Sequence, residues 1–248
     1  MPHSRLVLVT GASRGIGWAL SLKLLDAGSR GVGIERDFSH WSLPRTGFEA
    51  VAADLAELDG LPGLLSGIAG DYPELDAVVS NAGAGRFGHL EQFSPPRIRA
   101  CVDLNLTQHI LVARAFLPLL KHRSRADLIF MGSETALSGG IKGAVYSACK
   151  SALRGLARSL RQECAAAGVS ALSIRGWCGP AFSTGSIFVP ARRPKTPLPR
   201  RTWPMRLSPY SVHPHGTVVD EINLSPLKKV IRTGSRASHS LAHAQAKG

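Results

Sequence analysis

The sequence predicts an α/β fold in a single domain, with a doubly wound parallel sheet and helices on both of its faces. Short apolar runs alternate along the chain with longer stretches of helical spacing, and this alternation is typical of parallel strands joined by right-handed helical crossovers. A glycine-rich turn separates the first apolar run from the first helical stretch. With 248 residues, the chain is long enough to bury one sizeable core.

Each expected strand is a short apolar run bounded by turn residues, and each expected helix shows apolar residues three and four positions apart. The first helix carries Ile16, Leu20 and Leu24 on one face and ends at Gly28, a residue suited to a helix C-cap. Strands are expected at residues 5–10, 32–34, 51–53, 76–80, 128–131 and 169–174, and helices at residues 15–28, 95–121 and 146–167.

The formal net charge of +13 is unevenly distributed along the chain. Residues 175–248 hold 12 of the 30 basic residues and 2 of the 17 acidic ones, so their net charge is +10, whereas residues 1–174 have a net charge of only +3. We expect no nucleic-acid partner, because the part that is expected to fold is nearly balanced in charge. Nucleic-acid binding by the basic tail is an alternative, and it predicts a steep salt dependence of the affinity.

The sequence gives no sign of a membrane segment or a leader. The longest apolar runs fall well short of the roughly 20 residues that span a bilayer. The first expected strand starts at Arg5, so no signal peptide is expected. The four cysteines form no CxxC pair, so reduced thiols and a cytoplasmic location are expected. The nine histidines show no metal-ligand spacing, so no metal site is expected.

A phosphate-binding turn is expected between the first strand and the first helix. Glycines at this point let the chain turn tightly, and they let backbone N–H groups at the start of the helix approach a pyrophosphate. The residues expected to contact a dinucleotide in this turn are Gly11, Ser13, Arg14, Gly15, Ile16 and Gly17.

Residues at the end of the second strand bear on the choice of dinucleotide. Glu35 lies 20 residues beyond Gly15, where a carboxylate accepts hydrogen bonds from the ribose hydroxyls and repels a 2′-phosphate. Arg36 and Arg14 favour the opposite choice, because a guanidinium pairs with a 2′-phosphate. We expect NAD(H) to be favoured over NADP(H), and Arg36 to lie either at the cofactor or in a solvated loop.

A second group of residues has the spacing for proton transfer to a substrate oxygen. Tyr146 and Lys150 are four positions apart on an expected helix, so their side chains share one face. A tyrosine hydroxyl titrates at about pH 10, and a cation held beside it favours the phenolate that acts as a base. Ser133 follows the fifth strand, at the sheet edge where ligands bind, and its hydroxyl is expected to hold the substrate oxygen. Cys149, within this segment, is interpreted as a packing residue.

These motifs, in this order, resemble those of the short-chain dehydrogenase/reductase family. They are residues 10–17, Asn81-Ala82-Gly83, Ser133 and residues 146–150, and the resemblance covers residues 5–174. The resemblance implies a Rossmann-type fold, a nicotinamide dinucleotide cofactor and a small alcohol or ketone substrate. It also implies that Ser133, Tyr146 and Lys150 are catalytic.

The resemblance assigns further roles outside these motifs. Asp54, with the adjacent Leu55, is implied to lie beside the adenine of the cofactor. Asn105 is implied to bend its helix and to hold a water in the proton relay that leads to Lys150. The other residues implied to contact the cofactor are Asn81, Ala82, Gly83, Tyr146 and Lys150.

Family members are commonly dimers or tetramers that associate through two long helices. The helices expected at residues 95–121 and 146–167 occupy these places in this chain. A homo-oligomer is therefore expected, in which Leu111, Phe116 and Leu153 serve either the contact between subunits or the core.

The resemblance ends abruptly after residue 174. Family members continue with a Pro-Gly-x-Val-x-Thr loop and a helix that covers the substrate, whereas residues 180–214 hold 8 of the 16 prolines of the chain. We interpret residues 175–208 as translated in a shifted reading frame, because reading from the third base of the Trp177 codon into the Cys178 codon forces a valine codon. A genuinely divergent loop rich in proline and arginine is the alternative.

The reading frame is expected to return near residue 208. Residues 216–224 then resemble the last strand of the family, and the domain is expected to span residues 1–232. The polar residues 233–248 are expected to form a disordered tail. Because the disruption falls on the substrate and nicotinamide region, a dinucleotide-binding protein with little or no turnover is the alternative to an oxidoreductase.

Overall fold

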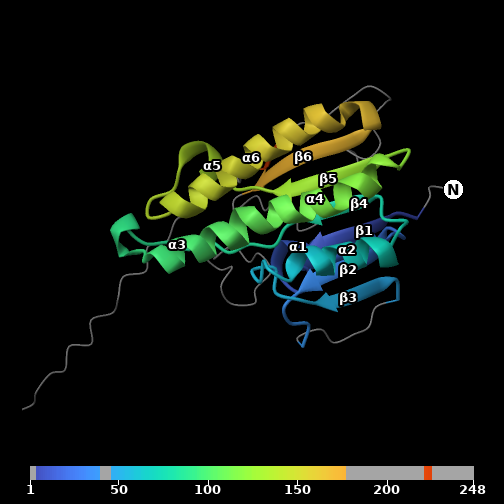
Figure 1. Cartoon of the computed structure of the whole chain (residues 1–248), viewed down its shortest axis with the longest axis horizontal. Coiled ribbons are helices and arrows are strands. Elements are labelled where there is room, and N and C mark those ends of the chain that lie inside the picture. The colour runs from blue at the N-terminus through green and yellow to red at the C-terminus, as the bar shows by residue number, and fades with distance from the viewer. Residues whose placement is uncertain (1–3, 40–45, 177–220, 225–248) are drawn as a thin grey trace, which may run out of the picture.

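The computed structural model describes residues 4–39, 46–176 and 221–224, and within them the chain forms one parallel sheet of seven strands. The order across the sheet is β3-β2-β1-β4-β5-β6-β7, and the part from β3 to β6 can be followed in Figure 1. This order reverses between β1 and β4, and in such sheets the crevice at that point binds the ligand. The strands are β1 (Leu6–Thr10), β2 (Arg30–Glu35), β3 (Phe48–Ala52), β4 (Ala77–Ser80), β5 (Ala126–Met131), β6 (Val169–Gly176) and β7 (Glu221–Leu224). The expected doubly wound α/β fold is thus confirmed.

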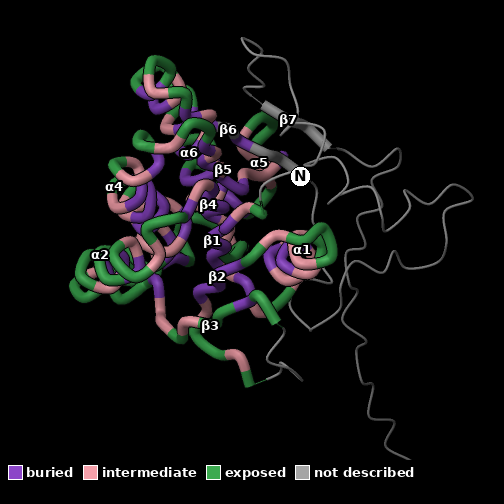
Figure 2. The backbone as a smooth tube through the Cα atoms, turned by 90° about the vertical axis from the view of Figure 1, so that its right-hand side faces the viewer, coloured by how far each residue is buried: buried purple, intermediate pink, exposed green. Residues whose placement is uncertain are grey.

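The helices lie on both faces of the sheet. Figure 2 shows α2, α4 and α6 on one face and α1 on the other. The helical segments are α1 (Gly15–Asp26), α2 (Leu61–Asp71), η1 (Leu90–Gln92), α3 (Pro95–Val102), the π-helical η2 (Asp103–Thr107), α4 (Gln108–Lys121), α5 (Thr135–Ser138), α6 (Ala144–Cys164) and η3 (Ala165–Ala167).

Strand β1 contributes to the core on both faces of the sheet. Leu6 and Leu8 pack into the larger cluster, which includes side chains of α2, α4 and α6. Val7 and Val9 point the other way and pack with Leu20 of α1. This alternation follows from the two-residue period of a strand, and burial on both faces is typical of a central parallel strand.

The structure differs from the expected helices at two places. The long helix expected over residues 95–121 is divided, because the π-helical turn η2 separates α3 from α4 at Asn105, the residue implied to bend this helix. The cause is visible at Asn105, whose Nδ2 donates a hydrogen bond to the Cys101 carbonyl at 2.9 Å and so competes with the regular helix ladder. Helix α2 was not expected, because it contains three glycines; its Leu61, Leu65 and Ile68 are nevertheless buried one turn apart.

Most of the region interpreted as aberrant lies outside the described residues. Residues 175 and 176 complete β6, whereas residues 177–208, the tail at 233–248 and the expected domain boundary at 232 are not described. The last strand was expected at residues 216–224. Its described residues, 221–224, form β7, which pairs in parallel with β6. Within the described ranges, no helix is both long enough and apolar enough to cross a bilayer.

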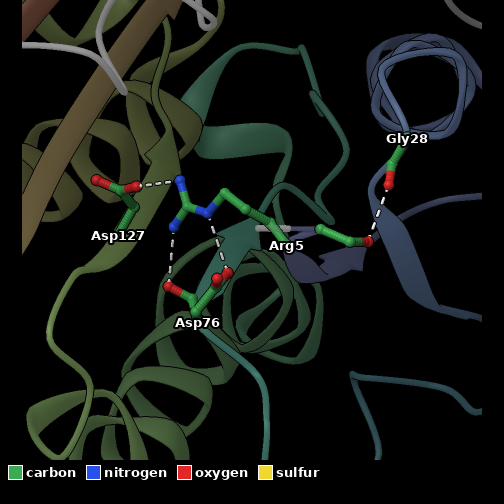
Figure 3. A network of polar contacts seen from close by, with 5 residues as sticks. Arg5, Gly28, Asp76 and Asp127 are labelled. Atoms are coloured by element: carbon green, nitrogen blue, oxygen red, sulfur yellow. Dashed lines mark hydrogen bonds and ion pairs between the residues drawn. The ribbon is translucent and has the colours of Figure 1, made fainter. Parts of the chain in front are cut away.

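An ion-pair network lies at the N-terminal ends of strands β1, β4 and β5 (Figure 3). Arg5 precedes β1, and its guanidinium lies 3.1 Å from Asp76 Oδ1 and 2.6 Å from Asp127 Oδ2. It also donates a hydrogen bond to the Asp76 carbonyl. These three side chains are only 16–25% exposed, so the network links β1, β4 and β5 in a partly desolvated environment.

Replacing Arg5 by methionine is expected to lower the free energy of unfolding by about 2–3 kcal/mol, because it leaves two partly buried carboxylates without their cation. The matched control is Arg30→Met, which removes a pair with Glu74 whose side chains are 49% and 47% exposed. That pair is expected to contribute less than about 1 kcal/mol. Urea unfolding of both variants measures the difference, and equal losses would contradict a special role for Arg5.

Candidate active site

The turn between β1 and α1 has room for glycine alone at its tightest point. Gly11 has a positive φ of 69°, and a Cβ atom placed on Gly17 would lie 2.1 Å from the Gly11 carbonyl oxygen. No side chain caps the start of α1, and its first turn holds no acidic residue. The backbone N–H groups there therefore suit an anion such as a phosphate. Among the other expected contacts in this turn, Arg14 is exposed, whereas Ser13, Gly15 and Ile16 are partly buried.

The ends of β1 and β4 are joined by hydrogen bonds of Thr10 and Asn81. Thr10 Oγ1 accepts hydrogen bonds from the backbone nitrogens of Asn81 and Ala82, at 2.9 and 3.0 Å. Asn81 Nδ2 donates in return to the carbonyl oxygens of Thr10 and Gly11. The Asn81-Ala82-Gly83 segment is thus fixed against the glycine turn. Thr10 is the first residue of the glycine-rich motif, but it was not among the expected site residues.

The residues expected to choose between the dinucleotides lie at the ends of β2 and β3. Glu35 Oε1 accepts a hydrogen bond from the Arg36 backbone nitrogen at 3.1 Å. Arg36 Nη1 lies 3.7 Å from Asp54 Oδ2, and the other Asp54 carboxylate oxygen accepts from the Ala56 nitrogen. Leu55 is buried in the larger core, so a cofactor contact at Leu55 would involve its backbone.

The structure brings Tyr146 and Lys150 together on one face of α6. Lys150 is only 3% exposed, and its Nζ donates a hydrogen bond to the Met131 carbonyl at the end of β5, at 2.9 Å. The same Nζ lies 5.8 Å from the centroid of the Tyr146 ring. A buried cation is therefore held beside a tyrosine at the C-terminal edge of the sheet.

Asn105 connects its helix to the segment that follows β4. Its Oδ1 accepts a hydrogen bond from the Ala84 nitrogen at 3.1 Å, and its Nδ2 donates to the Ala84 carbonyl. A Cβ atom on Gly83 would lie 2.9 Å from Asn105 Oδ1 and 3.5 Å from Lys150 Nζ. The space where a Gly83 side chain would stand is thus occupied by the amide of Asn105 and the ammonium of Lys150.

Ser133 lies in the short connection between β5 and α5 and is partly buried. Its Oγ accepts hydrogen bonds from the backbone nitrogen and the hydroxyl of Thr135, at 3.3 and 3.0 Å. These bonds orient the Ser133 oxygen, and they leave its own proton available to another acceptor.

Two buried polar residues that were not expected in the site contact the end of β4 and the segment that follows it. Gln108 Nε2 donates a hydrogen bond to the Ala82 carbonyl at 3.1 Å. His109 Nδ1 lies 2.6 Å from Ser80 Oγ, and its ring is fully buried. Complete burial, reinforced by the Lys150 cation, holds the pKa of His109 well below its usual value of 6.5.

Acid is expected to destabilise the protein through His109. Below about pH 6.5 the unfolded chain protonates this residue, whereas the folded chain keeps it neutral. The free energy of unfolding therefore decreases by up to about 1.4 kcal/mol for each pH unit of acidification. The double variant His109→Phe/Ser80→Ala removes both hydrogen-bond partners. Urea unfolding at several values between about pH 6.5 and 5 should give a shallower slope for this variant. Identical slopes would mean that His109 is protonated in the folded state.

The described cysteines are buried thiols. Burial, together with the neighbouring Cys101, raises the pKa of Cys149 to about 11. Such a thiol is protonated and unreactive at neutral pH, which supports the interpretation of Cys149 as a packing residue. In the part of the chain that the structure describes, no group of three His, Cys, Asp or Glu side chains is arranged to hold a metal ion.

A glycine-rich turn at the switch point of a doubly wound parallel sheet defines the class of Rossmann-fold proteins. Within this class, the chain belongs to the short-chain dehydrogenase family, whose model, described as short chain dehydrogenase, matches residues 5–182. The family expected from the sequence motifs is thus confirmed.

Two curated relatives illustrate the range of the family. The chain is 37% identical over 173 residues to the 1-deoxy-11-beta-hydroxypentalenate dehydrogenase of Streptomyces arenae, a match that covers 65% of this chain and 61% of the relative. It is 29% identical over 176 residues to the 2,3-dihydroxy-2,3-dihydro-p-cumate dehydrogenase of Pseudomonas putida, with 68% of each chain covered. The chain thus spans about three fifths of the length of the Streptomyces arenae relative.

Two solved structures of relatives carry the NADP cofactor. A metagenomic short-chain oxidoreductase in complex with NADP is 26% identical, with a TM-score of 0.73 over 90% of this chain and 97% of that one. A gluconate 5-dehydrogenase from Beutenbergia cavernae, described as putative and NAD(P) dependent, with NADP bound at low occupancy, is 28% identical. Its TM-score is 0.64, over 71% of this chain and 74% of that one.

Proposed function

We propose that this chain is an NAD(P)-dependent oxidoreductase that interconverts an alcohol and a carbonyl compound, with Tyr146 as the acid and base. The observation that carries the proposal is the Lys150 ammonium, which is buried and fixed 5.8 Å from the Tyr146 ring. A cation in this position stabilises the phenolate form of a tyrosine. The family of the chain supports the same reaction class.

Each catalytic side chain has a separate task in this proposal. Tyr146 takes the proton from the alcohol hydroxyl, and the alcohol carbon gives up a hydride to the oxidised nicotinamide, so that a ketone and the reduced cofactor are formed. Ser133 donates a hydrogen bond to the substrate oxygen while its own oxygen is held by Thr135. Asn105 is a positioning residue that holds the backbone of Ala84 and so places the preceding Gly83 beside Lys150.

The remaining expected residues would hold the dinucleotide. The Gly11–Gly17 contact provides a cradle that a Cβ atom would fill, so the pyrophosphate fits there against the start of α1. We infer that NAD(H) is preferred over NADP(H), because Glu35 presents a carboxylate at the end of β2 and Arg36 faces Asp54. Two solved structures of relatives hold NADP, so titration with both dinucleotides tests this preference.

A second candidate function is dinucleotide binding with little or no turnover. It is favoured by the sequence of residues 175–208, which lacks the Pro-Gly-x-Val-x-Thr loop of the family. Calorimetric titration with NAD⁺ and NADP⁺, combined with absorbance at the wavelength of the reduced cofactor in the presence of secondary alcohols, distinguishes the two functions. Binding with turnover supports the oxidoreductase, binding without turnover supports the second candidate, and tighter binding of NADP⁺ overturns the inference from Glu35.

We also propose a cytoplasmic homo-oligomer that associates through α4 and α6. An apolar groove between these helices is lined by Ile110, Leu117 and Leu156, among others, which supports a contact there. Phe116 and Leu153 are fully buried and belong to the core. Light scattering coupled to size exclusion measures the mass of the assembly, and Leu117→Glu is expected to reduce it to that of a monomer, because a carboxylate would be desolvated at the contact. A monomeric parent protein would refute this interface.

A further inference from the structure

Large apolar side chains remain exposed on two segments that meet at Tyr146. Phe87, which follows β4, is 56% exposed. Leu137 of α5 is 49% exposed, and Ile141, between α5 and α6, is 93% exposed. Single exposed apolar residues are ordinary on a protein surface. Three of them on segments that adjoin one proposed catalytic group require a specific explanation.

The Phe87 ring has a defined seat beside Tyr146. The centroids of the two rings are 5.9 Å apart, with a tilt of 59° between the planes. A Cβ atom on Gly85 would lie 2.7 Å from the Phe87 ring, and one on Gly143 would lie 3.2 Å from it. The two glycines therefore leave the space that the ring occupies, and Phe87 stays 56% exposed although its ring contacts that of Tyr146.

The segment that carries Ile141 is fixed to the segment that carries Phe87. The Gly88 nitrogen donates a hydrogen bond to the Lys142 carbonyl at 2.7 Å. Lys142 has a φ of 60°, and it is the one non-glycine residue with a positive φ in the described part of the chain. Strained backbone of this kind persists where the surrounding structure requires it, and it is enriched at ligand sites. The turn holds Ile141 outward although burial would stabilise that side chain.

We propose that Phe87, Leu137 and Ile141 form an apolar wall of the substrate site, and that the substrate is a secondary alcohol, or its ketone, with a large apolar carbon skeleton. This inference rests on the proposed function, because Tyr146 fixes where the reacting oxygen lies. The carbon skeleton then extends from that oxygen over the exposed face of Phe87. A polyol would have to desolvate its hydroxyl groups against these side chains without hydrogen-bond partners, which is unfavourable.

A series of 2-alkanols from 2-butanol to 2-decanol, oxidised by the full-length protein with saturating NAD⁺ or NADP⁺, tests the substrate class. The expected result is a rise in kcat/KM of up to about fourfold for each added methylene group, with sorbitol a much poorer substrate than 2-octanol. A flat series, or a preference for sorbitol, would overturn the inference while leaving the proposed oxidoreductase function intact.

Matched variants locate the wall. Phe87→Ala is expected to reduce the rise in kcat/KM for each added methylene group. Phe87→Leu is expected to preserve most of this rise, because leucine keeps an apolar surface at the site. The control is Leu90→Ala, since Leu90 of η1 is as exposed as Phe87, at 54%, and it is expected to leave the series unchanged. An equal effect of Leu90→Ala and Phe87→Ala would overturn the assignment of the wall.

A binding measurement separates this inference from the proposed function. Calorimetric titration of the protein–dinucleotide complex with 2-decanone requires no turnover. If 2-decanone binds and the Phe87→Ala variant binds it more weakly, the apolar site is supported. This holds even if no alcohol is oxidised, and in that case only the proposed oxidoreductase function is refuted. Absence of binding, or binding that Phe87→Ala does not change, overturns the inference.

Discussion

Replacing Tyr146 by phenylalanine is expected to lower kcat for alcohol oxidation by about 10²–10⁴-fold, the usual contribution of general acid–base catalysis. The variant loses one hydroxyl and keeps the ring, so the contact with Phe87 and the packing of α6 are preserved. Lys150 keeps its hydrogen bond to the Met131 carbonyl, because that bond does not involve Tyr146. The dinucleotide loses at most the contact of one hydroxyl, so its affinity is expected to fall by no more than about tenfold.

The chain offers a matched control for this substitution. The Tyr72 hydroxyl donates a hydrogen bond to Glu49, and this pair joins the end of α2 to β3, away from Tyr146. Tyr72→Phe removes the same atom and is expected to leave kcat unchanged. Initial rates with a secondary alcohol, together with calorimetric titration of the dinucleotide, measure both quantities. If Tyr146→Phe retained the rate of the parent protein, the proton would have to be transferred by another group, and the proposed mechanism would be wrong.

The parts of the fold that were predicted correctly depend on local patterns. The first strand is marked by an apolar run directly before a glycine turn, and the structure gives β1 the bounds Leu6–Thr10. Tyr146 and Lys150 meet because a helix brings residues four positions apart onto one face. Both signals are contained in a few neighbouring residues, so they can be read without knowledge of the tertiary structure.

The parts that were missed depend on contacts between distant residues. The ring of Phe87 lies beside that of Tyr146, and Ser80 Oγ lies beside the ring of His109; no periodicity links the members of these pairs. A bend at Asn105 was implied by the family resemblance, but its form, a π-helical turn, results from a side chain that competes with the backbone.

The same limit applies to the faces of the long helices. Spacing indicates that Leu111, Phe116 and Leu153 are apolar positions on helices, but it does not distinguish a core from a contact between subunits. The structure assigns Phe116 and Leu153 to the core, because they are fully buried between the sheet and the helices. Leu111 is partly buried against the same core. Three-dimensional packing thus decides a question that the helical period leaves open.

Replacing Gly17 by alanine is expected to abolish dinucleotide binding at concentrations that saturate the parent protein. The new Cβ atom would lie 2.1 Å from the Gly11 carbonyl oxygen and 2.7 Å from Asn81 Nδ2. The first of these neighbours is backbone, so the clash cannot be relieved by a change of rotamer. The turn has to move away from the start of α1, and overpacking of this kind also lowers the free energy of unfolding by about 1–3 kcal/mol.

A glycine-to-alanine substitution elsewhere in the chain is expected to have the opposite effect on the free energy of unfolding. Gly67 lies inside α2, and apart from its chain neighbours and the nearby backbone of this helix no atom lies within 4 Å of the position of its Cβ atom. Gly67→Ala is therefore expected to raise the free energy of unfolding by about 0.5–1 kcal/mol, since alanine loses less backbone entropy in a helix. Thermal unfolding and dinucleotide titration of both variants separate binding from stability. Normal NAD⁺ affinity in a folded Gly17→Ala protein would show that the pyrophosphate does not occupy this turn, because a turn displaced by the new methyl group cannot present the same N–H groups to it.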